Sequence, residues 1–307
     1  MKLSMARREA IAGYLFIIPW ILGFLAFTLG PIIASIILGF SKWNLMTPPQ
    51  FTGVENYINI FKDPLFYKSL KVTFIYTIFA VPLGLFFGLL IALLMNQGVR
   101  GITIFRTIYY LPAILSGVAV AVLWQKIFNP YFGVLNPILK KLHIMPILEL
   151  INSPVTWLYS EFWALPAFII MSLWGVGGSM IIYLAGLQGI PTHLYEAAEI
   201  DGASAFGRFR HVTIPMLSPI IFFNLIMGII GSFQVFVSSY VMTGGGPNNA
   251  TLFYVLNLYR QAFQYYRMGY GCALAWLLFT IIIGFTLIIW KSSPLWVYYA
   301  GEIRGRR

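Results

Sequence analysis

The chain contains uninterrupted apolar runs that are long enough to cross a lipid bilayer as α-helices. The first lies between Glu9 and Lys42, and no charged side chain interrupts it. A helix needs about 20 predominantly apolar residues to cross the hydrocarbon core, and five further runs meet that requirement. The sequence therefore predicts six spans: between Glu9 and Lys42, Val72–Met95, between Arg106 and Lys126, Phe162–Leu187, Val212–Val241 and Cys272–Trp290.

Composition supports a helical membrane protein and excludes other classes. Charged residues make up 9% of the 307 residues and hydrophobic residues 59%, whereas an ordinary soluble domain has about 25% charged residues. A chain this apolar is neither a water-soluble globule nor a disordered segment. Outer-membrane barrels show short alternating segments, which this sequence lacks. We predict an all-α integral membrane protein with six transmembrane helices.

The distribution of basic residues predicts the orientation of the spans. With a cytoplasmic N-terminus, the inner segments carry 11 Lys and Arg residues in 58 positions, and the outer segments carry nine in 93. Basic residues are enriched in cytoplasmic loops, so we expect both termini to be cytoplasmic. The predicted organisation is an N-terminal tail (1–10), a six-span domain (11–291) with a cytoplasmic loop at 190–215, and a basic C-terminal tail (292–307).

The sequence offers no catalytic or cofactor-binding constellation. It has no GxxxxGK[ST] phosphate loop, and neither a catalytic Ser-His-Asp set nor a catalytic pair of carboxylates can be proposed. The histidines are scattered, and the single cysteine, Cys272, excludes an intrachain disulfide. We expect no catalytic residue, no metal site and no cofactor on this chain. An energy source for uphill transport would then have to lie on another chain.

The cytoplasmic loop between the fourth and fifth spans has an unusual composition. After Pro191, Thr192 can cap a helix, Gly202 suits a left-handed stop, and Ser204 can cap a second helix. We expect a helix–turn–helix that carries three acids and several alanines. On physical grounds alone, it is either a docking helix or an interfacial helix whose acids pair with Arg208 and Arg210.

This loop resembles the conserved cytoplasmic loop of ABC importer permeases. The resemblance extends over almost the whole chain, including LFIIPWILGFLAFTLGPI near the start and VMTGGGPNNATLFYVLNLYRQAF after the fifth span. These segments resemble the F/A-type subunit of maltose- and glycerophosphate-type permeases. A leucine is commoner where Ile214 stands. The loop matches at Glu196, Ala197, Ala198, Asp201, Gly202, Ala203, Phe209, Ile214, Pro215 and Pro219.

The resemblance implies a permease subunit of a binding-protein-dependent carbohydrate importer of the type I fold, with an oligosaccharide as the favoured solute. It implies a multi-pass protein of the bacterial inner or plasma membrane that pairs with a second permease. Two copies of an ATP-binding subunit would hold ATP and magnesium, and a solute-binding protein would deliver the sugar. By carry-over, the helix that couples to the ATPase contains Glu196, Ala197, Ala198, Asp201, Gly202 and Ala203.

The fifth span offers polar side chains for a sugar path. The resemblance singles out Ser232, Gln234 and Ser238, because the end of this span lines the sugar pocket in related permeases. Alternatively, hydroxyls and amides in a span bond the backbone or a neighbouring helix. The full set of candidates is Asn224, Ser232, Gln234, Ser238 and Tyr240.

The TGGGPNN segment that follows the fifth span has two interpretations. Its composition alone indicates a flexible turn. The resemblance places it on the outer side, where glycine would let the backbone follow the binding protein closely. The residues expected there are Gly244, Gly245, Gly246 and Pro247.

Three other functions remain as alternatives. A permease for another solute, such as glycerol phosphate, would need basic side chains in the path, and the spans carry none. An ion-coupled secondary transporter would need ionisable residues inside its spans. A membrane scaffold without transport activity would leave the cytoplasmic loop unexplained.

Overall fold

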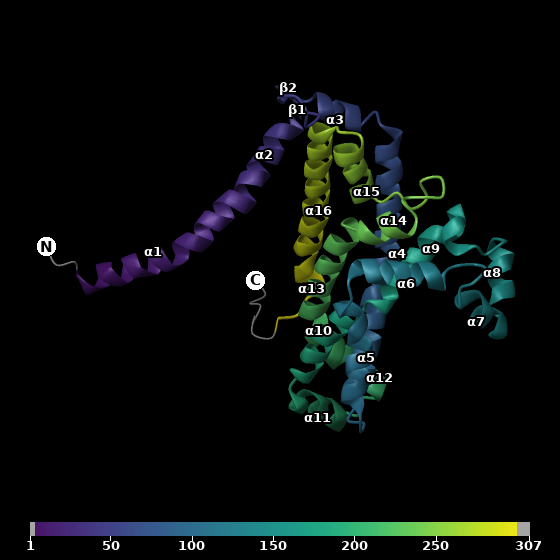
Figure 1. Ribbon diagram of the computed structural model, residues 1–307. Coiled ribbons are helices and arrows are strands. Elements are labelled where there is room, and N and C mark those ends of the chain that lie inside the picture. The colour runs from purple at the N-terminus through teal and green to yellow at the C-terminus, as the bar shows by residue number, and fades with distance from the viewer. Residues whose placement is uncertain (1–3, 300–307) are drawn as a thin grey trace. The chain divides into compact units, whose positions relative to one another are not determined.

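The computed structural model describes residues 4–299, apart from the side chains of Arg8 and Ala10. These residues are predominantly helical (Figure 1). They form two compact units, one of residues 4–63 and 258–279 and the other of residues 64–257 and 280–299. The boundary falls within α15 (Tyr254–Tyr259) and within α16 (Met268–Trp296). The extreme ends of the two predicted tails, residues 1–3 and 300–307, lie outside the described residues.

In the first unit, the first predicted span is a continuous helix. It consists of α1 (Met5–Phe24), a π-helical segment (Leu25–Leu29) and α2 (Gly30–Gly39). The π-helical segment ends two residues before Pro31, whose ring cannot fit against the carbonyl four residues earlier in a regular α-helix. A second π-helical segment, Phe209–Thr213 in the other unit, ends at the same distance from Pro215.

A short structured loop completes the first unit. The strands β1 (Ser41–Lys42) and β2 (Gln50–Phe51) pair antiparallel, with Ser41 opposite Phe51, and α3 (Glu55–Ile60) follows them. After α15, the π-helical segment Arg260–Gln264 leads into α16. The first unit therefore joins the loop after α2 to the beginning of α16.

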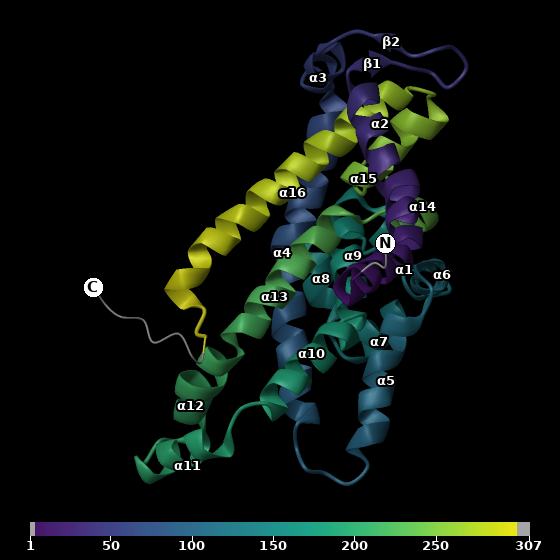
Figure 2. The same cartoon turned by 90° about the vertical axis from the view of Figure 1, so that its left-hand side faces the viewer.

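In the second unit, α4 (Pro64–Met95) packs against α13 (Ile214–Phe233) and α10 (Gly177–Gln188), as Figure 2 shows. The second and sixth predicted spans are each one helix, α4 and α16, and both begin before the predicted start. The fifth runs from α12 (Ala205–Arg208) through α13 to α14 (Val237–Met242), with an irregular step at residues 234–236.

The third and fourth predicted spans are not single helices. The third divides into α5 (Ile102–Ile114) and α6 (Gly117–Ile127), which meet at 101°, because Leu115 and Ser116 are extended. The fourth divides into α9 (Glu161–Trp174) and α10, bent by 43°. The described residues thus contain four helices long enough to cross a membrane, or up to six if each bent pair is one span.

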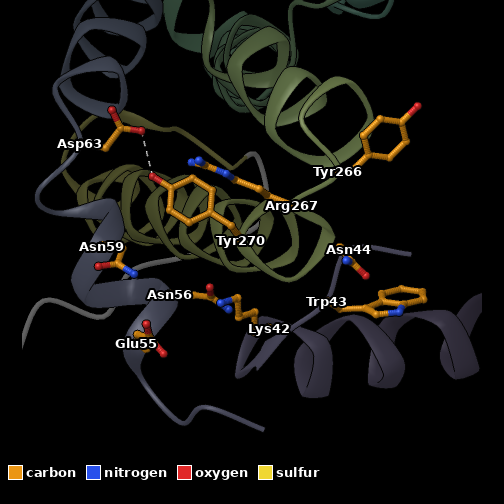
Figure 3. A pocket seen from close by; sticks show the side chains of 10 residues that line it. All are labelled: Lys42, Trp43, Asn44, Glu55, Asn56, Asn59, Asp63, Tyr266, Arg267 and Tyr270. Atoms are coloured by element: carbon orange, nitrogen blue, oxygen red, sulfur yellow. Dashed lines mark hydrogen bonds between the residues drawn. The ribbon is translucent and has the colours of Figure 1, made fainter. Parts of the chain in front are cut away.

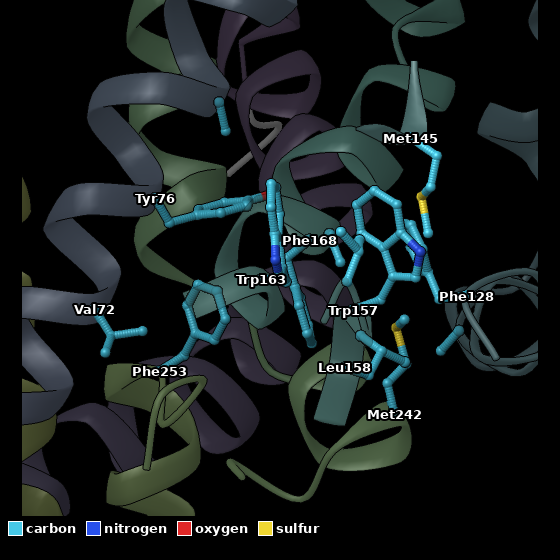
Figure 4. Close-up of a cluster of buried hydrophobic side chains, with 14 residues drawn as sticks. Val72, Tyr76, Phe128, Met145, Trp157, Leu158, Trp163, Phe168, Met242 and Phe253 are labelled. Carbon is cyan, nitrogen blue, oxygen red and sulfur yellow. The ribbon is translucent and has the colours of Figure 1, made fainter. Parts of the chain in front are cut away.

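Two buried clusters hold the second unit together. One packs against the C-terminal half of α4 and includes Met95, Tyr183 and Leu217. The other packs against the middle of α4, and there Phe253 contacts the rings of Tyr76 and Phe168 at centroid distances of 5.1 and 5.6 Å (Figure 4). This second cluster also packs on short elements between α6 and α9, namely α7 (Leu135–Lys141), α8 (Met145–Ile151) and the 3₁₀ turn Trp157–Tyr159.

Candidate functional site

The predicted helix–turn–helix forms in the loop between α10 and α13. The first helix, α11, spans Thr192–Ile200. It ends in a Schellman motif, in which the Gly202 amide donates to the Glu199 carbonyl at 3.0 Å and the Ala203 amide donates to the Ala198 carbonyl at 2.9 Å. Gly202 has a φ of 77°, so glycine is required there for its tolerance of the left-handed conformation.

The second helix begins as the sequence predicts, whereas the first does not. The Ser204 hydroxyl accepts a hydrogen bond from the Gly207 amide at 3.2 Å and caps α12. The expectation that Thr192 caps α11 is wrong, because the capping position is Pro191 and Thr192 is the first helical residue. The fixed φ of proline already directs the chain into the helix, and no side-chain cap is present at this end.

One face of α11 is anchored to the bundle. Leu194 and Tyr195 pack against the buried cluster formed by α4, α10 and α13. The Tyr195 hydroxyl lies 3.1 Å from the Thr213 hydroxyl, which is 5% exposed at the entrance to α13. The loop is therefore connected directly to the helix that carries the candidate sugar path.

The opposite face of α11 is open. Glu196 and Ala197 are exposed, and Ile200 exposes 87% of its surface; Phe206, on the neighbouring α12, exposes 68%. Among the described residues, Glu196 makes no ion pair, whereas Glu199 pairs with Arg208 at 3.2 Å across the glycine turn. The pair between Glu199 and Arg208 matches the self-paired interfacial helix in part, whereas the exposed Glu196 and the exposed apolar side chains beside it suit a docking surface.

The polar candidates of the fifth span divide between two cavities. Asn224 and Ser232 line the first, of about 200 Å³, together with side chains from α4, α9 and α10. The Ser232 hydroxyl lies 2.9 Å from the Thr77 hydroxyl and donates to the Ile229 carbonyl at 2.8 Å. The Asn224 amide likewise donates to the Ile220 carbonyl at 3.1 Å. Both residues thus use part of their hydrogen-bonding capacity within the bundle.

The second cavity lies at the irregular step between α13 and α14. It measures about 340 Å³ and includes Gln234 and Ser238, opposite Gly117 at the beginning of α6. Gln234 is exposed. Tyr240 lines neither cavity, and its ring stacks on Phe236 at 5.5 Å. The structure therefore brings four of the five candidates to cavities and leaves the fifth outside them.

The TGGGPNN segment forms a turn that is braced by internal hydrogen bonds. The Thr251 hydroxyl donates to the Gly246 carbonyl at 2.7 Å and lies 2.6 Å from the Thr243 hydroxyl. The Ser239 hydroxyl donates to the Thr251 carbonyl at 2.6 Å. Positive φ angles occur at Gly244, Gly245, Asn248 and Asn249, and these are the residue types that tolerate them. Gly244, Gly246 and Pro247 are half-buried, and Gly245 is buried.

Several cavity residues did not emerge from the sequence. Tyr76, Ser172 and Ser179 line the first cavity together with the polar residues of α13. Small hydroxyls inside otherwise apolar runs were the available signal, and Ser172 and Ser179 flank the glycines at which α9 and α10 bend. The position of that bend decides which helix faces carry these hydroxyls to the cavity, and it is not visible from hydropathy.

Comparisons with known proteins agree on the kind of protein that this chain resembles. A family model described as "Binding-protein-dependent transport system inner membrane component" matches residues 73–292. A probable ABC transporter permease of Bacillus subtilis, YesP, is 43% identical over 300 residues, which is 96% of this chain and 94% of that protein.

A second relative is the trehalose/maltose transport system permease MalF of Thermococcus litoralis. It is 35% identical, and the match covers 92% of this chain and 94% of that protein. Among solved structures, a bacterial alginate ABC transporter, in complex with an alginate pentasaccharide-bound periplasmic protein, contains a chain that matches with a TM-score of 0.79. At 22% identity, over 95% of this chain and 97% of the other, the likeness shows a common fold.

Proposed function

Because this chain belongs to the family of binding-protein-dependent transport system inner membrane components, we propose that it is a permease subunit of an ATP-driven carbohydrate importer. The observation that carries the proposal is the anchored helix–turn–helix, which presents an open acidic rim at the end of the bundle. The family consists of transport components and not of enzymes. Carbohydrate is favoured because one relative is named for trehalose and maltose, and an oligosaccharide is the favoured size.

The proposed arrangement in the membrane has six spans, each bent helix pair counting as one, with both termini in the cytoplasm. Its support is the length and hydropathy of the helices and the higher density of Lys and Arg in the inner segments. The six-span domain covers 11–291, with the coupling loop at 190–215. The flanking tails, 1–10 and 292–307, are cytoplasmic in this proposal.

The coupling mechanism follows from the two faces of α11. An ATP-binding subunit would bind the open face of α11, at Glu196, Ala197 and the glycine turn. Its closure on ATP would move α11 as a rigid body, and the contact between Tyr195 and Thr213 would pass that movement to α13. ATP would act by shifting the equilibrium between inward- and outward-facing states. ATP and magnesium would stay on the partner subunit, and this chain would hold no cofactor.

The two cavities around α13 are the proposed sugar path. Neutral hydroxyls and amides, including Ser232 and Gln234, suit the hydroxyl groups of a sugar. Each cavity is small for an oligosaccharide, and a second permease subunit would supply the other wall. On the outer side, a solute-binding protein would dock on the braced loop at Gly244–Pro247 and deliver the sugar.

The proposal is tested by purification of this chain from its native membrane in a mild detergent. We expect a second six-span permease and an ATP-binding subunit to co-purify with it, and the solute-binding protein to stimulate ATP hydrolysis. A control importer purified in parallel shows whether the detergent preserves such complexes. A lone chain without ATPase activity, while the control stays intact, would contradict the proposal.

Replacement of Tyr195 by phenylalanine should loosen coupling without unfolding the chain. The change removes one hydroxyl and leaves the buried Thr213 hydroxyl without that partner, at a cost of about 1–3 kcal/mol. We expect less sugar to be transported per ATP hydrolysed. Thr213→Val should give the same defect, and the double variant no more than either. Additive defects, or an unchanged ratio of transport to hydrolysis, would show that this contact does not transmit the movement.

A further inference from the structure

The first unit contains a cavity of about 440 Å³ that the proposed mechanism does not use. It lies between the end of β1 with the residues that follow it, α3 and the start of α16 (Figure 3). All of its lining residues belong to the first unit, whereas the two path cavities are lined by the second unit alone. This cavity, here called the loop pocket, is therefore a separate feature.

The walls of the loop pocket are held in place by hydrogen bonds. The Asn56 side-chain amide donates to the carbonyls of Gly39 and Ser41, at 2.9 Å each, and fastens α3 to the end of α2. The Tyr270 hydroxyl donates to the Asp63 carboxylate at 2.9 Å. A side chain on Gly269 would overlap the Ser41 carbonyl, so the start of α16 lies directly against β1. The loop pocket is preformed.

The lining combines aromatic rings with planar polar groups. Trp43, Tyr266 and Tyr270 supply ring surfaces. The Asn44 Oδ1 atom already accepts three local hydrogen bonds, so its amide group is the part left to donate to a ligand. Asn56 has the opposite role, because its amide group is engaged and its Oδ1 atom is left to accept. The lining thus offers donors, acceptors and ring faces at once.

The charges and the side-chain types of the loop pocket disfavour two classes of ligand. Lys42 and Arg267 are matched by Glu55 and Asp63, which disfavours a ligand of high net charge, such as a phosphate. None of the lining residues is aliphatic, which disfavours a lipid chain or another apolar ligand. An uncharged ligand rich in hydroxyl groups satisfies both conditions.

From this lining we infer that the loop pocket binds neutral carbohydrate of one or two sugar rings. The location of the loop pocket on the outer side of the membrane rests on the proposed function, because residues 41–71 are outer in that arrangement. The volume lies within the range of about 300–1,000 Å³ that is typical of small-molecule sites. The loop pocket would hold sugar at the outer surface, on a part of the chain separate from the path cavities.

Cysteine labelling tests this inference, because Cys272 is the only cysteine of the chain. In a Cys272→Ala background, Asn59→Cys places a thiol in the loop pocket, and Lys62→Cys places one on the exposed surface nearby, outside the lining. Purified complexes, without solute-binding protein, are labelled with a maleimide. The probes are trehalose, maltose, lactose and arabinobiose, and glycerol serves as the control solute.

We expect at least one of these sugars to slow labelling at position 59 but not at position 62. Protection should saturate, and it should reach about elevenfold at ten times the dissociation constant. Trp43→Ala should abolish protection while the partner subunits still co-purify, which shows that the variant is folded. Equal labelling with all four sugars would overturn the inference. So would protection by sugar-free binding protein alone, because the pocket would then be a protein contact.

The same preparations separate this inference from the proposed function. If sugar protects position 59 in a chain with which no ATP-binding subunit co-purifies, the importer assignment is refuted and the inference about the loop pocket is supported. ATP-dependent uptake of one of these sugars, with no protection at position 59 by any of the four, would refute the loop pocket alone.

Discussion

Replacement of Glu196 by lysine should reduce carbohydrate uptake at least about tenfold while the chain remains inserted and folded. Glu196 is exposed on the open face of α11, and among the described residues it makes no ion pair. The folded chain therefore does not depend on its charge. A partner surface complementary to the acidic rim would instead meet a like charge, which costs several kcal/mol at an interface.

Glu149→Lys is the matched control for Glu196→Lys. Glu149 is also an exposed glutamate on a short helix, α8, and the substitution changes the net charge by the same amount. We expect near-normal uptake from this control and normal amounts of both variants in the membrane. Uptake at the wild-type level by Glu196→Lys, measured with labelled sugar in cells, would remove α11 from the coupling role.

Replacement of Gly177 by valine should remove most of the folded protein from the membrane. Gly177 begins α10, and a Cβ atom there would overlap the backbone carbonyl of Tyr109 in α5. The obstacle is backbone and cannot rotate away as a side chain could, so α10 and α5 would have to separate. Overpacking of a core costs about 1–3 kcal/mol, and occasionally more, which is a large part of the stability of a typical domain.

The neighbouring Gly178 provides the control for Gly177→Val. A Cβ atom at Gly178 would meet nothing within 4 Å, so Gly178→Val adds the same side chain to the same helical turn without the backbone overlap at Cβ. We expect fluorescence-detected gel filtration to give a normal peak for Gly178→Val and an aggregated or missing peak for Gly177→Val. Equal peaks would mean that α5 and α10 do not pack as closely as the structure has them.

The features that the sequence predicted well are those that depend on neighbouring residues. Gly202 and Ser204 set the turn and the second helix of the loop between α10 and α13 through contacts within about one helical turn. The helices at 72–95 and 272–290 follow from hydropathy alone. The 101° bend at Leu115 and Ser116 does not, because an apolar run has the same hydropathy whether it is straight or broken.

Contacts between distant residues explain the other differences from the sequence analysis. The loop around Gly245 is braced because Thr243 and Thr251 meet after the chain has turned back, a contact that composition cannot reveal. The cavity at Ser232 draws its other polar groups from three further helices. The contact between Tyr195 and Thr213 likewise joins residues on opposite sides of the glycine turn.

Reconstitution tests the central claim most directly. Proteoliposomes containing this chain, its partner permease and the ATP-binding subunit should accumulate labelled sugar only when ATP and the solute-binding protein are both present. Accumulation should survive an ionophore and should fail with Glu196→Lys. Uptake that persists without the ATP-binding subunit and collapses with the ionophore would contradict the account and identify an ion-coupled transporter.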